Sequence, residues 1–163
     1  MLRSRKVRRG QTAVEMMLVT MIVLTGIIVA APLYVDNSFD STLLYAVRNA
    51  ASQASAYVST GVVVNDSKYS PLNELIRDYT GYRSVILKFV GVKMLSKNDT
   101  DASVLVRFEY ALPLDSTSES VFEAKLGEFM ALYLNGTSEF RLSDGNLYYK
   151  GKRVDLSVEV VSP

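Results

Sequence analysis

The chain of 163 residues contains no cysteine and no histidine. Without cysteine no disulfide can form, and without histidine the common zinc, copper, haem and serine-type triad sites are excluded. A phosphate-binding P-loop and a dinucleotide-binding glycine fingerprint are also missing. No set of nucleophile, base and orienting group is visible, so the sequence predicts a protein that is not an enzyme and that has no metal or cofactor.

The N-terminus combines a basic tail with a long apolar run. Five of the first ten residues are basic, the next charged residue is Glu15, and residues 16–35 carry no charge. About 20 apolar residues suffice to cross a bilayer as one helix. Lysine and arginine remain on the cytoplasmic side, so we expect the N-terminus inside and the chain after residue 35 outside. Basic tails can bind nucleic acid, but beside an apolar span the orientation signal is preferred and no nucleic-acid partner is expected.

Two ordinary interpretations of this segment remain open. A secretory signal peptide has a shorter apolar core of roughly 7–15 residues, and the best small-residue cut site, Val29-Ala30-Ala31, is followed by Pro32. A signal anchor that is never cut fits the length and the charges. It leaves Gly10 and the lone carboxylate of Glu15 unexplained, although a carboxylate beside an apolar span is costly and usually marks a function.

The stretch Arg-Arg-Gly-Gln-Thr-Ala-Val-Glu, from Arg8 to Glu15, runs directly into the apolar helix. It resembles the class III signal peptide of type IV pilin-like proteins. The residue pattern is most like that of archaeal pilins and is also similar to that of tight-adherence (Tad) pseudopilins. The resemblance covers roughly residues 5–60. It implies that a prepilin peptidase recognises Arg8 and Arg9 and cuts after Gly10. Gln11 then becomes the first mature residue, and residues 1–10 are a cleaved leader.

The resemblance also implies how subunits assemble. Glu15 takes the family's fifth mature position, where the glutamate pairs with the new α-amine of a neighbouring subunit, and Pro32 falls where many pilins carry a proline. The expected partners are further copies in a helical filament, the peptidase, a pilus assembly ATPase and a membrane platform protein. Independently of the family, Glu15 could simply cap the helix start, where the macrodipole favours an acid.

The expected organisation is a long N-terminal helix over residues 11–60, membrane-spanning in 16–35 and forming the filament core, followed by a head domain over 61–163. Proline lacks a donor and clashes with the preceding turn, so the helix should kink or loosen at Pro32 to Ser38 and then resume. Small residues over Thr42 to Thr60 suit close helix packing, either against the head or against neighbouring subunits. Gly61 should end the helix.

The head reads as α+β, a small antiparallel sheet of about four strands with packed helices. Period-two alternation predicts a strand over 102–112 with one buried face. An Asp-Gly turn predicts a hairpin near the C-terminal end of the head. The expected strands are 62–64, 85–95 (apolar on both faces and therefore covered on both), 102–112, 140–142, 147–149 and 154–160, and the expected helices are 71–79 and 118–134.

Three Asn-x-Ser/Thr sequons begin at Asn65, Asn98 and Asn135, all in expected loops. The orientation places them outside, so they are candidate N-glycosylation sites, although asparagine and serine gather in turns anyway. Asp99 and Asp101 could contact calcium, but further ligands are missing at that spacing and a solvated turn is favoured.

The sequence therefore leads to a structural protein: a subunit of an extracellular type IV pilus-like filament, made as a cytoplasmic-membrane precursor and then placed on the cell surface. Adhesion, motility and DNA uptake are the alternative tasks of such a filament. Two alternatives stay open for the subunit itself. These alternatives are a minor pseudopilin and a membrane-anchored extracellular binding module that forms no filament.

Overall fold

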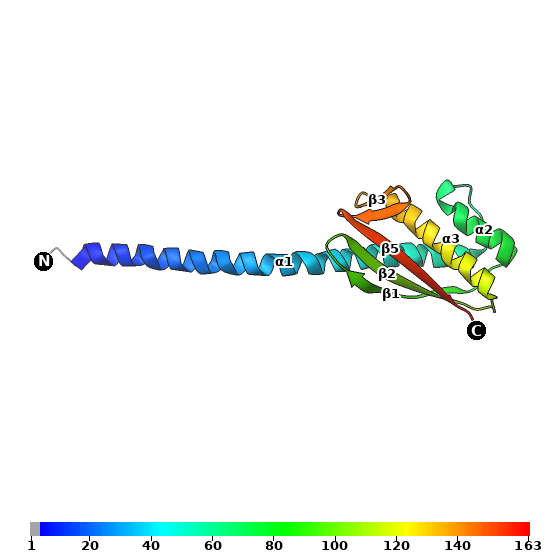
Figure 1. Cartoon of the computed structure of the whole chain (residues 1–163), viewed down its shortest axis with the longest axis horizontal. Coiled ribbons are helices and arrows are strands. Elements are labelled where there is room, and N and C mark those ends of the chain that lie inside the picture. The colour runs from blue at the N-terminus through cyan, green and yellow to red at the C-terminus, as the bar shows by residue number, and fades with distance from the viewer. Residues whose placement is uncertain (1–3) are drawn as a thin grey trace. The chain divides into compact units, whose positions relative to one another are not determined.

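The computed structural model describes residues 4–163, with side chains described for residues 13–31 and 38–163. The chain divides into two units, residues 1–41 and residues 42–163, and each is described by itself. The first helix, α1 (Ser4–Thr60), belongs to both units, and the remaining elements all belong to the second (Figure 1). The architecture is α+β, as the sequence predicts, with a long apolar helix preceding a sheet with packed helices.

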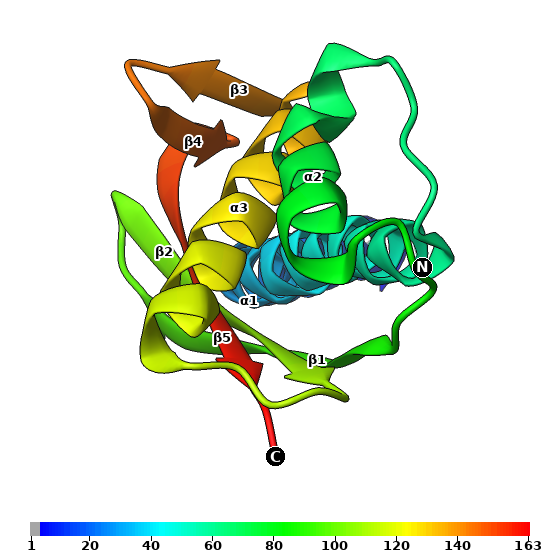
Figure 2. The ribbon, with the colours of Figure 1, turned by 90° about the vertical axis from the view of Figure 1, so that its right-hand side faces the viewer.

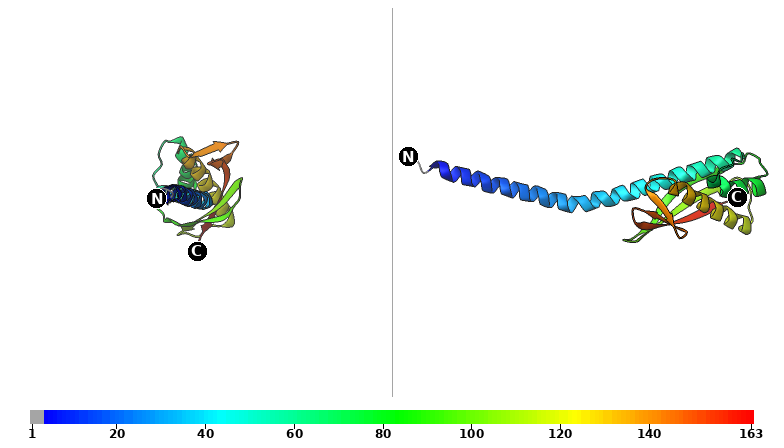
Figure 3. Two further views of the ribbon diagram at one scale, coloured as in Figure 1. Left: turned by 90° about the vertical axis from the view of Figure 1, so that its left-hand side faces the viewer. Right: turned by 90° about the horizontal axis from the view of Figure 1, so that it is seen from above.

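The helix α1 extends over the whole of the helix expected for residues 11–60. The expected loosening at Pro32 to Ser38 is wrong, because α1 continues through this segment without a break (Figure 3), whereas the expected kink stays a prediction. A proline removes one intrahelical hydrogen bond and does not by itself end a helix. Apolar membrane helices tolerate proline particularly well.

In the second unit, α1 supplies one side of the core. Its buried side chains recur at spacings of three and four, so they form one face of the helix. All of them have zero exposure: Leu43, Val47, Ala50, Ala51, Ala54 and Val58. The alanines allow close packing, and the predicted small-residue face is therefore divided between this core and a solvent-exposed side that includes Ser52 and Ala56.

After α1 the chain forms a short helical segment made of η1 (Ser67–Tyr69), α2 (Ser70–Leu75) and the π-helical turn η2 (Ile76–Thr80). This confirms the helix expected over 71–79, with Pro71 at its start, where a missing N–H costs nothing. Gly81, at φ 57°, ends it.

The sheet has five strands in the order β1-β2-β5-β4-β3. Of the four pairs of neighbouring strands, three are antiparallel and one, β2 with β5, is parallel. The parallel pair differs from the all-antiparallel sheet that the sequence suggests. A parallel pair needs a long crossover, and α3 (Ser116–Asn135) lies within it. The strands are β1 (Leu87–Lys97), β2 (Asp101–Tyr110), β3 (Phe140–Ser143), β4 (Asn146–Tyr149) and β5 (Lys152–Val161).

One face of the sheet is packed against helices. The alternate residues of β2 on this face are all buried, and α3 contributes an apolar stripe that includes Phe122, Leu126 and Phe129. Figure 2 shows α1, α2 and α3 on the same side of the sheet. Within the described residues no helix covers the opposite face, which we call the outer face.

The expectation that the strand at 85–95 is covered on both faces is wrong. It forms β1, the edge strand of the sheet, and its side chains Val90 and Leu95 are 52% and 51% exposed. Part of the apolar content that suggests a central strand, Val90 and Leu95, thus lies on the uncovered face, whereas Leu87 is buried. Exposed lysines at positions 88 and 93 interrupt this apolar content, as is common in edge strands that avoid uncontrolled pairing.

Gly61 should be more sensitive to substitution than Gly81, although both have positive φ. A Cβ on Gly61 would lie 2.7 Å from the carbonyl carbon and oxygen of Arg83, whereas Gly81 has nothing within 4 Å. Gly81→Ala should cost about 1–2 kcal/mol from left-handed strain, and Gly61→Ala about 1–3 kcal/mol more from the clash. Urea unfolding of the detergent-solubilised chain, followed by tyrosine fluorescence, measures both. Equal losses would contradict the close approach.

Candidate functional site

The most unusual surface in the first unit is the segment Ala13–Ala31 of α1. It is long and apolar enough to cross a membrane, with a mean hydropathy of 2.3, and none of it is buried within the structure. Side chains such as Met17, Met21 and Ile28 are each more than 70% exposed. A surface of this kind requires lipid or protein around it, because exposing so much apolar area to water carries a high free-energy cost.

The polar side chains within this span are satisfied by the helix itself. The hydroxyls of Thr20 and Thr25 each donate to the backbone carbonyl oxygen four residues earlier, of Met16 and Met21, at 2.8 Å. No hydroxyl donor of these two residues therefore needs water, and the segment is compatible with a hydrocarbon environment.

Glu15 is the exception in this span. It lies exposed near the N-terminal end of Ala13–Ala31, and none of the side chains that the structure describes forms an ion pair or hydrogen bond with it. A carboxylate placed in an apolar environment needs a cation or several donors. The described part of the chain therefore presents an acid that lacks an internal partner and lies on an otherwise apolar surface.

The other predicted processing and assembly residues cannot be placed in the same way. Arg8, Arg9, Gly10 and Gln11 belong to α1 by their backbone, and so does Pro32, but their side chains lie outside the described residues. The cut after Gly10 and the roles of these side chains stay predictions.

All three sequon asparagines, Asn65, Asn98 and Asn135, are exposed, as an acceptor for a glycan requires. Two of them also serve local structure. The Asn135 side-chain oxygen accepts from the backbone N–H of Leu142 at 2.7 Å, and Asn98 organises the turn between β1 and β2. Their side-chain nitrogens are the atoms that glycosylation would use, so these roles of the oxygens do not compete with it.

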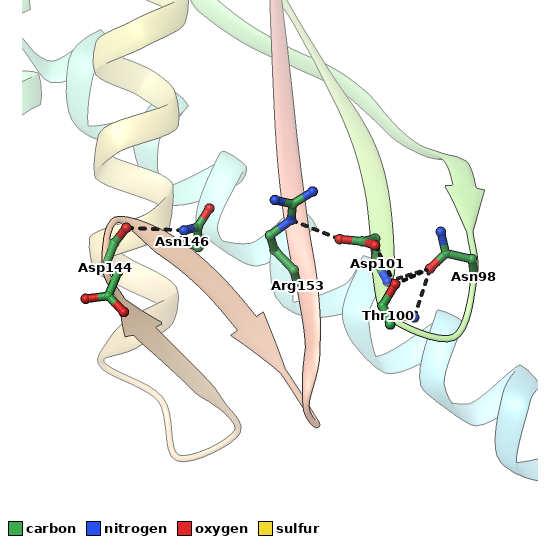
Figure 4. A network of polar contacts seen from close by, with 6 residues as sticks. All are labelled: Asn98, Thr100, Asp101, Asp144, Asn146 and Arg153. Atoms are coloured by element: carbon green, nitrogen blue, oxygen red, sulfur yellow. Dashed lines mark hydrogen bonds and ion pairs between the residues drawn. The ribbon is translucent and has the colours of Figure 1, made fainter.

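Figure 4 shows the turn at Asn98. Its side-chain oxygen accepts from the backbone N–H groups of Thr100 at 2.9 Å and of Asp101 at 2.6 Å. The Asp101 carboxylate lies 2.9 Å from Arg153 on the neighbouring strand β5. The Thr100 hydroxyl, followed by the Arg153 guanidinium, lowers the pKa of Asp101 below its ordinary value. Asp101, for which the sequence favours a solvated turn over a calcium site, is thus engaged by the protein's own donors.

Sequence reasoning missed a second polar cluster, which fixes the loop after α1. The Tyr57 hydroxyl donates to the Asn73 side-chain oxygen at 2.6 Å and accepts from the Val64 N–H at 2.7 Å. The Asn73 amide donates to the Val64 carbonyl oxygen at 2.9 Å. Both backbone groups of Val64 are therefore occupied by side chains, and the strand expected over 62–64 is wrong. Only the long-range contact of Tyr57 with Asn73 reveals this, and no local pattern signals it.

Tyr57→Phe should destabilise the head by about 1–3 kcal/mol, because it leaves the Val64 N–H and the Asn73 oxygen without their partner. Partial burial, which also raises the pKa of Tyr57, prevents water from replacing the hydroxyl fully. Tyr45→Phe is the matched control, since Tyr45 is 72% exposed. Comparable urea midpoints for the two variants would show that the cluster does not stabilise the loop.

The fold and this surface define the class of the chain: an α+β protein whose N-terminal apolar helix has the character of a membrane span or a signal. Comparison with protein-family models, curated proteins and solved structures gives no match to this chain.

Proposed function

We propose that the chain is the structural subunit of an extracellular type IV pilus-like filament, processed after Gly10 and assembled through its apolar helix. The observation that supports this most is the pairing of a fully exposed apolar segment with one carboxylate, Glu15, that has no partner among the described side chains. The resemblance of residues 8–15 to a class III signal peptide adds a reason for the position of that carboxylate.

The proposed cut would create a cation that could pair with Glu15. Hydrolysis after Gly10 creates an α-amine on Gln11, and such amines are charged near neutral pH, with an ordinary pKa of about 7.7–8.0. Glu15 lies only one helical turn from Gln11. The α-amine of a neighbouring copy at a similar depth in the membrane could therefore approach the Glu15 carboxylate. The pair would set the axial position of each incoming subunit.

Burial of the apolar helices against one another would then hold the filament together. Each square ångström of apolar surface removed from water contributes about 25 cal/mol. Extraction from lipid gains much less, because lipid already satisfies apolar contacts. An energy source is therefore required, which agrees with an assembly ATPase and a membrane platform protein as partners, and with the cytoplasmic membrane as the site of the precursor.

A second candidate is a membrane-anchored extracellular binding module. The observation that favours it is the same helix, since an exposed apolar segment of this length would also serve as a permanent anchor. In that case the head would act alone, and Glu15 would have no essential role. A minor pseudopilin would differ from the main subunit only in its abundance in the filament.

Immunogold electron microscopy of intact cells tests the proposal. Antibody against the head should label thin filaments at regular intervals along their length, and deletion of the gene should remove both label and filaments. Label restricted to the cell envelope would favour the anchored module, and label at filament tips only would favour the minor subunit.

A further inference from the structure

The outer face of the sheet carries two shallow hollows beside the edge strand β1. One has a volume of about 440 Å³ and is lined by residues that include Val90, Arg107 and Val161. The other has a volume of about 330 Å³ and is lined by residues that include Val90, Leu95 and Leu105. Because they share Val90 and Arg107, the hollows form one continuous surface, which we call the β1 patch.

Two β-bulges create this patch. The pairing of β1 with β2 shifts between Phe89 and Gly91 and again between Met94 and Ser96, so Val90 and Leu95 are the extra residues. Bulges re-aim side chains, and here each places an apolar one on the uncovered face. Both are about half exposed, at 52% and 51%. An edge strand that exposes two such side chains beside Leu105 is suited to contact with another protein surface.

The charges around the β1 patch leave one cation uncompensated. Arg107 forms a two-pronged pair with Glu159, with a closest distance of 2.9 Å, and Lys88 lies 3.9 Å from Glu109. Lys93, exposed between the two bulges, makes no ion pair within the described part of the chain. The β1 patch therefore combines exposed apolar side chains with one positive charge that has no ion-pair partner among the described residues.

A complementary surface lies on the same head. The loop after α1 exposes three successive valines, Val62, Val63 and Val64, at 61%, 37% and 48%, followed by the exposed acid Asp66. The Tyr57 and Asn73 side chains hold this loop at Val64, so its shape is set before any contact. In Figure 2 the loop and the outer face lie on opposite sides of the head, with α1 between them.

We propose that the valine loop, residues 62–66, of one copy docks on the β1 patch of the next. Apolar valines would cover Val90, Leu95 and Leu105, and Asp66 would approach Lys93. Two different surfaces on opposite sides of one head form a heterologous contact, which continues from copy to copy instead of closing into a dimer. This inference rests on the proposed filament and names the head surfaces that meet in it.

The absence of cysteine makes a direct test possible, since engineered thiols are the only ones in the chain. Filaments sheared from cells that produce the double variant Val62→Cys/Leu95→Cys are treated with a short bifunctional thiol reagent. The expected result is a ladder of covalent oligomers, with a linked peptide joining positions 62 and 95. The double variant Val62→Cys/Ala124→Cys is the control, because Ala124 is exposed on α3, on the helix side of the sheet, and should give no ladder.

Each other outcome is decisive. Filaments that assemble but give no link between positions 62 and 95 overturn the docking and leave the proposed function intact. Dimers from Leu95→Cys alone also overturn it, because they show like surfaces meeting. If the double variant does not assemble, co-production of the two single variants repeats the test with one change per chain and should give dimers only. If the wild-type chain forms no filaments, the proposed function fails, and the docking fails with it.

The docking also predicts whether Asn65 is glycosylated. A glycan on Asn65 would stand between the two copies, because Asn65 lies within the valine loop. Asn65 should therefore be unmodified in filaments, and peptide mass spectrometry that finds it fully modified there would contradict the contact.

Discussion

Gly10→Leu should leave the chain uncut, with the basic leader still attached and no chain in the surface fraction. The physical reason is steric, since a peptidase that cuts beside a membrane must bring the scissile bond close to its catalytic groups, and a residue without a side chain allows that approach. A branched side chain of four carbons at this position would keep the bond away. Immunoblotting of whole cells should show only the precursor, larger by ten residues.

Gly26→Leu is the control for this prediction. Gly26 lies within the apolar span, and a Cβ there meets nothing within 4 Å, so the change adds apolar surface without a clash. This variant should be processed normally, whatever its effect on later assembly. Normal processing of Gly10→Leu would remove the assignment of the N-terminus to a class III signal peptide.

Glu15→Gln should allow processing but reduce filament yield by on the order of a hundredfold or more. Removing one partner of a buried ion pair costs about 3–5 kcal/mol, because the remaining charge stays in a poorly solvating environment. Glutamine retains the shape and can accept a hydrogen bond, so the loss reports on the charge itself. The measured quantity is the amount of chain in the sheared fraction relative to the amount processed in the membrane.

Two further variants define what the loss means. Glu139→Gln, at an exposed position of the head, removes the same charge elsewhere and should leave the yield unchanged. Glu15→Asp keeps the charge on a shorter side chain and should recover part of the yield. A wild-type yield from Glu15→Gln would show that the carboxylate only caps the helix start, where its contribution is smaller, typically about 0.3–1 kcal/mol.

Local patterns in the sequence predict much of the fold. The helix stop at Gly61 and the hairpin at Asp144-Gly145 follow from local backbone preferences, and both are confirmed. The amphipathic period of α3 likewise places Phe122 and Leu126 in the core. These signals work because each depends on residues within a few positions of one another.

The errors have a different origin, because they depend on partners distant in the chain. Three valines favour a strand over 62–64, but Tyr57 and Asn73 occupy the backbone groups that a strand would use. The parallel pairing of β2 with β5 depends on the crossover that contains α3, and periodicity does not distinguish it from antiparallel pairing.

The candidate site shows the same division. The sequence predicts the apolar span and the isolated Glu15, because both are properties of consecutive residues. It does not predict the β1 patch, since the bulges at Val90 and Leu95 appear only when the register with β2 is known. Apolar residues on both faces of a strand indicate that both faces are covered. They do not indicate whether the covering surface belongs to the same chain or to another copy.

The mature N-terminus of the chain is the most direct test of the proposed filament, and intact-mass and N-terminal peptide analysis of the sheared surface fraction and of membranes measures it. A filament subunit predicts that the sheared fraction contains a chain that begins at Gln11, with the apolar helix retained. A chain that begins at Met1 and is confined to membranes would contradict this and indicate an anchored module, and a start near Pro32 would indicate a secreted head.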